Sequence, residues 1–116
     1  MQYMCLIYSA EDNRPNHSDA ETATVMQRYM EFGKEMQANG KLIAGDALQP
    51  VSTATTISVR DGKTQTTDGP FAETKEQLGG YYLLECNDLD DALACAAKIP
   101  ASEYGRIEVR PLMVFE

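Results

Sequence analysis

Four short apolar runs along the chain predict β-strands. They are Tyr3–Tyr8, Lys41–Ala47, Tyr81–Cys86 and Arg106–Phe115. Tyr3–Tyr8 is apolar and aromatic on both faces, which is typical of a strand in the interior of a sheet. A strand of this kind needs a covering layer on each side.

Two longer stretches carry apolar residues at helical spacing. Ser18 and Glu21 form a capping box that begins the first helix, and Asn39-Gly40 ends it. The second helix begins at Asp88 and stops at Pro100. The apolar stripe of the first helix consists of Val25, Tyr29, Phe32 and Met36, widened by Met26, Met30 and Gly33. The stripe of the second consists of Leu89, Ala92, Leu93, Ala96 and Ile99.

A hairpin separates the two halves of the chain. Thr55–Arg60 and Lys63–Thr67 flank Asp61-Gly62, a dipeptide that suits a tight hairpin turn. The order is therefore β-α-β, a hairpin insertion, and β-α-β again. This order predicts an α+β fold of the ferredoxin-like split βαβ type, with residues 1–116 forming one domain.

The apolar pattern also predicts self-association. Two helices cover only one face of a sheet, yet Tyr3–Tyr8 and Tyr81–Cys86 are apolar on both faces. An uncovered apolar face of this size favours an interface. We therefore expect a homodimer in which two sheets pack face to face and make a barrel-like centre.

Composition narrows the functional classes. The 43% hydrophobic and 24% charged content is ordinary for a globular protein, and no apolar run is long enough for a membrane span. No secretory signal pattern opens the chain, so we expect a cytoplasmic protein. The net charge of −8 opposes binding to nucleic acid.

One histidine, His17, and the absence of a Cys-x-x-Cys pair argue against a metal site, and no cofactor is expected. The three cysteines, Cys5, Cys86 and Cys95, are interpreted as structural free thiols.

Charged residues near the predicted sheet have two interpretations. Glu108 and Arg110 share one face of the last strand, either as an ion pair or with Arg110 holding an anionic or carbonyl substrate. Asp68-Gly69-Pro70 predicts a turn. The following Glu73, Lys75 and Glu76 form either a solvated loop or a lid over a pocket at the mouth of the sheet.

A tyrosine and an acid are candidates for chemistry. Tyr29 lies on the helix stripe and Asp46 ends a strand, so both are expected near one sheet edge. The first interpretation of Tyr29 is a core residue. The second is that Tyr29 donates a hydrogen bond or orients its partner while a partly buried Asp46, with a raised pKa, acts as general base. His17, in the preceding polar loop, is expected to be exposed.

The segments TDGPFAETKE, GGYYLLE, KLIAGDAL, DLDDALACAAKIP and IEVRP together resemble the YCII-related family, in the subgroup named for its DGPF motif. The resemblance spans the whole chain and implies a dimeric α+β barrel. Some relatives carry a His-Asp pair in the barrel, and one is associated with dehydrochlorination of a chlorinated hydroxyhydroquinone. Tyr29 stands where that histidine is expected and Asp46 near the acid, so this chain lacks the imidazole of those relatives.

Two functions of different class follow. The first is a cofactor-independent lyase or isomerase acting on a small polar or aromatic molecule. Asp46 is then the base and Tyr29 orients it, while Arg110 and Lys75 hold developing negative charge, with Asp68 and Glu73 in the binding loop. The second is a non-catalytic ligand-binding or regulatory module. Similar proteins are often encoded beside extracytoplasmic-function sigma factors, which implies a regulatory partner.

Overall fold

The computed structural model describes residues 1–11 and 19–115 as an α+β protein with two α-helices and two antiparallel sheets. The strands are β1 (Gln2–Ser9), β2 (Leu42–Ala47), β3 (Thr55–Arg60), β4 (Lys63–Asp68), β5 (Gln77–Glu85) and β6 (Arg106–Pro111). The helices are α1 (Asp19–Ala38) and α2 (Leu89–Ala96), with short 3₁₀ turns at Val51–Thr53 and Pro100–Glu103. His17 and the Ser18 cap lie outside the described residues.

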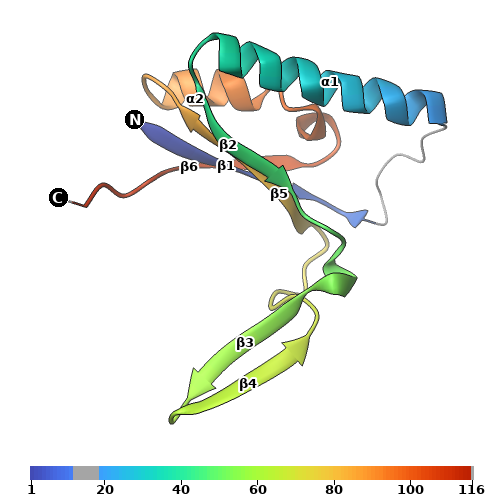
Figure 1. Ribbon diagram of the computed structural model, residues 1–116, viewed down its shortest axis with the longest axis vertical. Helices are drawn as coiled ribbons and strands as arrows, with labels where there is room; N and C mark the ends of the chain where they lie inside the picture. Colours follow the sequence, from blue (N-terminus) through green and yellow to red (C-terminus); the bar gives the residue numbers. More distant parts are fainter. Residues whose placement is uncertain (12–18, 116) are drawn as a thin grey trace.

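The larger sheet has the strand order β2-β5-β1-β6, and every neighbouring pair in it is antiparallel. β1 therefore lies in the interior, as its two-sided apolar pattern predicted. One face of this sheet packs against both helices, which lie together on that side (Figure 1). The buried core consists of Tyr3, Cys5, Phe32, Met36, Leu84, Cys86, Ala92, Cys95, Ala96, Ile99 and Ala101.

Local sequence signals explain most of the element ends. Gly40 has a φ of 70°, which suits the left-handed end of α1. The Asp88 side chain accepts a hydrogen bond from the Asp91 backbone N–H at 2.8 Å and caps α2 as predicted. Asp61 and Gly62 have φ angles of 51° and 73°, and they close the β3–β4 hairpin.

Some boundaries differ from the prediction. β5 begins at Gln77, so Gly79-Gly80 lies inside the strand rather than before it. β6 ends at Pro111 instead of Phe115, because it pairs only with β1, and Tyr3 near the start of β1 already lies opposite Pro111. α2 ends at Ala96, where Lys98 and Ile99 donate to carbonyls three residues back before Pro100.

The helix stripes are narrower than predicted. Met26 and Met30 are both 60% exposed, so they do not widen the buried face of α1. Leu89 and Leu93 of α2 are also about half exposed. The small residues Ala92, Cys95 and Ala96 are buried instead, so they form the face of α2 that packs against the sheet.

The other face of the larger sheet, which we call the open face, has no helix over it among the described residues. Strand alternation places it opposite the buried Tyr3, Cys5 and Leu84. Its central strands contribute Met4, Leu6, Tyr8, Leu78, Tyr81 and Leu83, and its outer strands contribute Asp46, Arg106, Glu108 and Arg110. The open face is thus an apolar strip with charged residues along its edges.

The β3–β4 hairpin projects from the rest of the chain (Figure 1). The molecule measures 48 × 47 × 18 Å along its principal axes, and its radius of gyration is 16.3 Å. A compact domain of this length has a radius of gyration of about 13 Å. The protomer is therefore flat and extended.

Candidate functional site

Asp46 and Tyr81 form a hydrogen-bonded pair on the open face. The Tyr81 hydroxyl donates to Asp46 Oδ2 at 3.0 Å, because β2 and β5 pair with these two residues directly opposite each other. The hydrogen bond and the negative charge of Asp46 raise the pKa of Tyr81, so this phenol stays protonated and remains a donor. Asp46 is exposed, which corrects the expectation that it is partly buried.

The pair belongs to a single row across the sheet. Asp46 lies opposite Tyr81, Tyr81 opposite Leu6, and Leu6 opposite Glu108. Glu108 accepts a hydrogen bond from the Arg110 guanidinium. Since neighbouring strands lie about 4.8 Å apart, the acid and the ion pair stand on either side of an apolar floor about two strands wide.

Tyr29 lies on the helix side of the sheet. It packs against the buried core beside Tyr82, whose ring lies 4.8 Å from that of Phe32. Tyr81 and Tyr82 are consecutive in β5, so their side chains point to opposite faces of the sheet. Tyr29 lies on the same side as Tyr82, whereas the Asp46 carboxylate lies on the side of Tyr81. Burial, and then the neighbouring Tyr104, raise the pKa of Tyr29. Tyr29 is therefore a neutral core phenol, and the phenol partner of Asp46 is Tyr81.

A small cavity still joins these residues at the end of β2. It has a volume of about 420 Å³ and is bordered by Tyr29, Asp46, Tyr81 and Tyr104, among others. Tyr29 from α1 and Asp46 from β2 both border it. They reach it from opposite faces of the sheet, so they do not form a direct pair.

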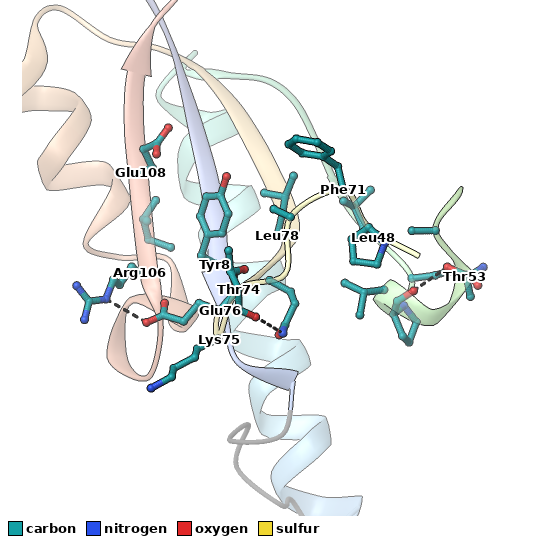
Figure 2. Close-up of a pocket in the computed structure, with 18 residues that line it drawn as sticks. Tyr8, Leu48, Thr53, Phe71, Thr74, Lys75, Glu76, Leu78, Arg106 and Glu108 are labelled. Atoms are coloured by element: carbon teal, nitrogen blue, oxygen red, sulfur yellow. Dashed lines mark hydrogen bonds and ion pairs between the residues drawn. The ribbon is translucent and has the colours of Figure 1, made fainter. Parts of the chain in front are cut away.

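A larger cavity of about 1090 Å³ opens where the sheet meets the loop after β4. Tyr8, Leu78 and Ile107 form the sheet side of this cavity, while Leu48 and Phe71 belong to the connecting segments. Figure 2 shows Phe71, Leu48 and Leu78 at one side of the cavity, with Arg106, Glu76 and Lys75 at the other. The cavity therefore has an apolar side and a charged side, which suits a small molecule with an apolar body.

Glu76 is the polar residue at the charged side. Its Oε1 accepts from Arg106 Nε at 3.1 Å (Figure 2), and its backbone carbonyl accepts from the Thr74 hydroxyl. Its Oε2 is buried and has no hydrogen-bond partner among the described residues. Buried acceptors without a partner are uncommon in folded proteins. Glu76 therefore stands out from the surface charges around it.

The predicted binding residues are distributed over both regions. Lys75 lines the larger cavity, whereas Glu73 is exposed and borders neither cavity. Arg110 lies on the open face, where it pairs with Glu108. Asp68 is the last residue of β4 and is exposed, beside Gly69 with a φ of 97°. The loop is thus part of the wall of the cavity through Phe71, Lys75 and Glu76.

The three cysteines lie together on the helix side as buried free thiols. Burial, and then the neighbouring Cys95, raise the pKa of Cys5 and of Cys86 to about 11. Protonated thiols are poor nucleophiles and poor metal ligands. Among residues 1–11 and 19–115, no group of three or more His, Cys, Asp and Glu side chains is arranged to hold a metal ion.

The fold and the site define a small α+β protein with one covered sheet face and one open face. The whole chain, residues 1–116, matches the YCII-related domain. It is also 37% identical over 118 residues to an uncharacterized protein of Rhizobium meliloti (strain 1021), an alignment covering all of this chain and 95% of the relative. The chain belongs to the YCII-related family. No helix within the described ranges has the length and apolarity needed to cross a membrane.

Sequence reasoning missed Tyr81 and Arg106 as site residues. Tyr81 was assigned to an apolar strand, and only the register with β2 reveals that its hydroxyl faces Asp46. Arg106 begins the last strand, 30 residues after its partner Glu76. The available signal was alternation: in both strands, these residues fall on the face opposite the buried core.

Proposed function

We propose that this YCII-related protein is a cytoplasmic homodimer of ferredoxin-like units in the DGPF subgroup. The strand order β2-β5-β1-β6 with two helices on one face supports the ferredoxin-like arrangement. The apolar strip of the open face supports a dimer in which two open faces pack together around a barrel-like centre. The Asp68-Gly69-Pro70-Phe71 segment supports the subgroup.

The proposed activity is cofactor-independent proton transfer on a small polar or aromatic molecule, of the lyase or isomerase kind. The observation that carries it is the Tyr81–Asp46 hydrogen bond beside an apolar floor. Asp46 accepts the proton from the substrate, and Tyr81 orients the carboxylate and donates to it. Lys75 and Arg106, near the mouth of the larger cavity, attract an anionic group of the substrate.

Tyr29 contributes indirectly in this proposal. Its neutral phenol holds α1 against β5 beside Tyr82 and keeps the end of the sheet in place. Arg110 holds Glu108 at the far edge of the row rather than contacting the base. Asp68 ends β4 and Glu73 lies in the loop that follows it; neither borders the cavity, and their contribution is to the charge around it.

The test is carbon-bound hydrogen exchange. The protein is incubated in D₂O with a panel of hydroxyphenols and keto acids, and loss of carbon-bound hydrogen is followed by ¹H NMR. Asp46→Asn removes the base but keeps an acceptor for Tyr81, and it should slow exchange about 10²- to 10⁴-fold. Asp90→Asn, at an exposed position of α2, is the matched control and should exchange at the wild-type rate.

The same experiment distinguishes the proposed enzyme from the second candidate function. That candidate is a non-catalytic ligand-binding or regulatory module, including one linked to sigma factors. The apolar side of the larger cavity favours this role. Binding of a panel compound at Tyr8 and Leu78, seen as shifted NMR resonances, with no exchange above background in wild type or Asp46→Asn would exclude proton transfer. The protein would then be assigned as a binding module.

A further inference from the structure

The three buried cysteines differ in what surrounds their sulfur atoms. All of them belong to the core on the helix side, and all are free thiols. Among the described residues, Cys95 alone accepts a hydrogen bond from a cation, because Lys41 Nζ lies 3.8 Å from Cys95 Sγ. An ammonium group at this distance stabilises a thiolate, which is the form of cysteine that attacks a peroxide. Cys95 is therefore the thiol placed to react first.

The Lys41 side chain connects this thiol to the surface. Lys41 Nζ also pairs with Asp91 Oδ1 at 2.5 Å, and both of these side chains are about one-fifth exposed. Cys95 retains 5% exposure beside them, whereas Cys5 has 0%. A small oxidant such as hydrogen peroxide therefore has a path to Cys95 along the ion pair, and the sulfur of Cys5 is closed off.

Backbone hydrogen bonds hold a second thiol at the same cluster. The Glu85 N–H donates to the Lys41 carbonyl at 2.7 Å, and the Asn87 N–H donates to Asp91 Oδ2 at 2.9 Å. Cys86 lies between Glu85 and Asn87 in the sequence. Both neighbours of Cys86 are thus fastened to the ion pair that reaches Cys95.

The side chains of Cys86 and Cys95 meet inside this arrangement. Asp91 and Cys95 are four residues apart, so they share one face of α2. The Cys86 and Cys95 thiols are hydrogen-bonded to each other. For Cys5, burial and the charge of Cys95 act on the thiol without a hydrogen bond between the two in the part of the chain that the structure describes. Cys86 is therefore the partner of Cys95.

We propose that Cys86 and Cys95 form an oxidation site, at which hydrogen peroxide converts the two thiols into a disulfide. The Cys95 thiolate attacks one peroxide oxygen, the O–O bond breaks, and hydroxide leaves, so that Cys95 becomes a sulfenic acid. The Cys86 sulfur then attacks the Cys95 sulfur, the S–O bond breaks, and the Cys86 proton leaves with the hydroxyl group as water. The peroxide is reduced to water while the two thiols lose two electrons.

The disulfide links the sheet to the helix layer. Cys86 directly follows β5, and Cys95 lies in the last turn of α2, so the new bond closes the connection between these two elements. Disulfides that form in reducing compartments are mostly transient and redox-sensing. The inference is independent of both proposed functions, because it uses none of the residues assigned to them.

The first measurement uses the folded wild-type protein. The reduced protein is exposed to hydrogen peroxide, the remaining thiols are alkylated, and the digested peptides are identified by mass spectrometry. We expect a Cys86–Cys95 link within one chain, with Cys5 still alkylated, and dithiothreitol should restore all three thiols. A link that contains Cys5, a link between chains, or thiols that stay free at peroxide concentrations that oxidise the urea-denatured protein would overturn the proposal.

The second measurement separates the parts of the two thiols. Cys86→Ser removes the resolving thiol, so oxidation should stop at the Cys95 sulfenic acid, which dimedone traps. Cys95→Ser should give neither a disulfide nor a dimedone adduct. Cys5→Ser is the matched control, because it removes a thiol of the same core and should leave the Cys86–Cys95 link intact. Equal dimedone labelling of the Cys86→Ser and Cys95→Ser variants would overturn the order of reaction.

The third measurement tests the cation. Lys41→Met should slow disulfide formation at least about tenfold, because the ammonium group no longer stabilises the Cys95 thiolate. Lys34→Met, at an exposed position of α1, is the control and should change the rate less than about threefold. A rate in Lys41→Met that equals or exceeds that of wild type would overturn the role of the cation. Circular dichroism of each variant verifies that the sheet and the helices remain folded.

Discussion

Gly80 lies where β5 passes close to the backbone of β2. A Cβ at this position would stand 2.9 Å from the Asp46 carbonyl oxygen and 3.3 Å from the Ala47 Cα. Both are backbone atoms of the paired strand, so neither can move without disturbing the sheet. Gly80 thus has a steric reason, because a side chain there would press against the strand that carries Asp46.

Replacing Gly80 therefore has a predictable cost. Gly80→Ala should lower the free energy of unfolding by about 1–3 kcal/mol, as overpacking in a core does. Gly33→Ala is the matched control, because a Cβ at Gly33, inside α1, meets nothing within 4 Å. It should raise stability by about 0.5–1 kcal/mol through the better helix propensity of alanine. Urea unfolding of both variants measures the difference, and equal destabilisation would contradict the steric explanation.

The sequence predicts helix caps and turns correctly where they depend only on neighbouring residues. The Asp88 cap, the Asp61-Gly62 turn and the Gly40 helix end were all predicted and are confirmed. Each depends on one or two residues and their own backbone angles. Site partners were not readable in this way, because Tyr81 and Asp46 are 35 residues apart.

At the scale of elements, an ion pair ties the start of β2 to α2. Lys41 Nζ lies 2.5 Å from Asp91 Oδ1 and 3.8 Å from Cys95 Sγ. The hydrogen bond from Lys41, and then that from the Asn87 backbone, lower the pKa of Asp91 below its usual value. The same bond raises the pKa of Lys41. Both side chains are only about one-fifth exposed, so this is a partly shielded contact between two elements.

The lowered pKa of Asp91 predicts how stability responds to acid. An acid with a lower pKa in the folded state stabilises the fold at pH values above its unfolded pKa, near 4, and loses this contribution as the pH falls further. The difference in unfolding free energy between wild type and Asp91→Asn should therefore be constant near neutral pH and shrink below about pH 4. Urea unfolding from pH 7 to pH 2.5 measures it.

A double-mutant cycle provides the control for this prediction. In a Lys41→Met background the Asp91→Asn substitution should have a smaller effect at neutral pH, because the hydrogen bond to Lys41 is the main cause of the shift. An unchanged effect in that background would assign the stabilisation to the Asn87 backbone hydrogen bond at 2.9 Å instead.

At the scale of the whole molecule, the unequal faces of the sheet are the main feature. The helix face has a closed core, whereas the open face keeps Met4, Leu6 and Leu83 only partly buried. A single protomer of this shape leaves apolar surface in water, which disfavours the monomer. The proposed dimer follows from this imbalance.

The proposed open-face dimer predicts that a single charge introduced on the open face strongly weakens dimerisation. Leu6→Lys should weaken dimerisation at least about tenfold, because it buries an ammonium group in the apolar strip, where the opposite acid, Glu108, already pairs with Arg110. Leu93→Lys makes the same chemical change at a 47% exposed position of α2 and should leave the dimer intact. Light scattering across micromolar concentrations distinguishes the two. A Leu6→Lys protein that dimerises like wild type would place the interface elsewhere.

The sequence by itself determined the elements of this protein, their order, the turns between them and the family. These features depend on local periodicity, on backbone angles available to particular residues and on a recognisable pattern of segments. Only the tertiary structure decided which side chains meet. Pairing register placed Asp46 with Tyr81, helix packing put Tyr29 on the other face of the sheet, and the segment before β5 brought Glu76 to Arg106. The physical reason is that a shift of one residue in register moves every side chain of a strand to the opposite face, and the local sequence does not encode that choice.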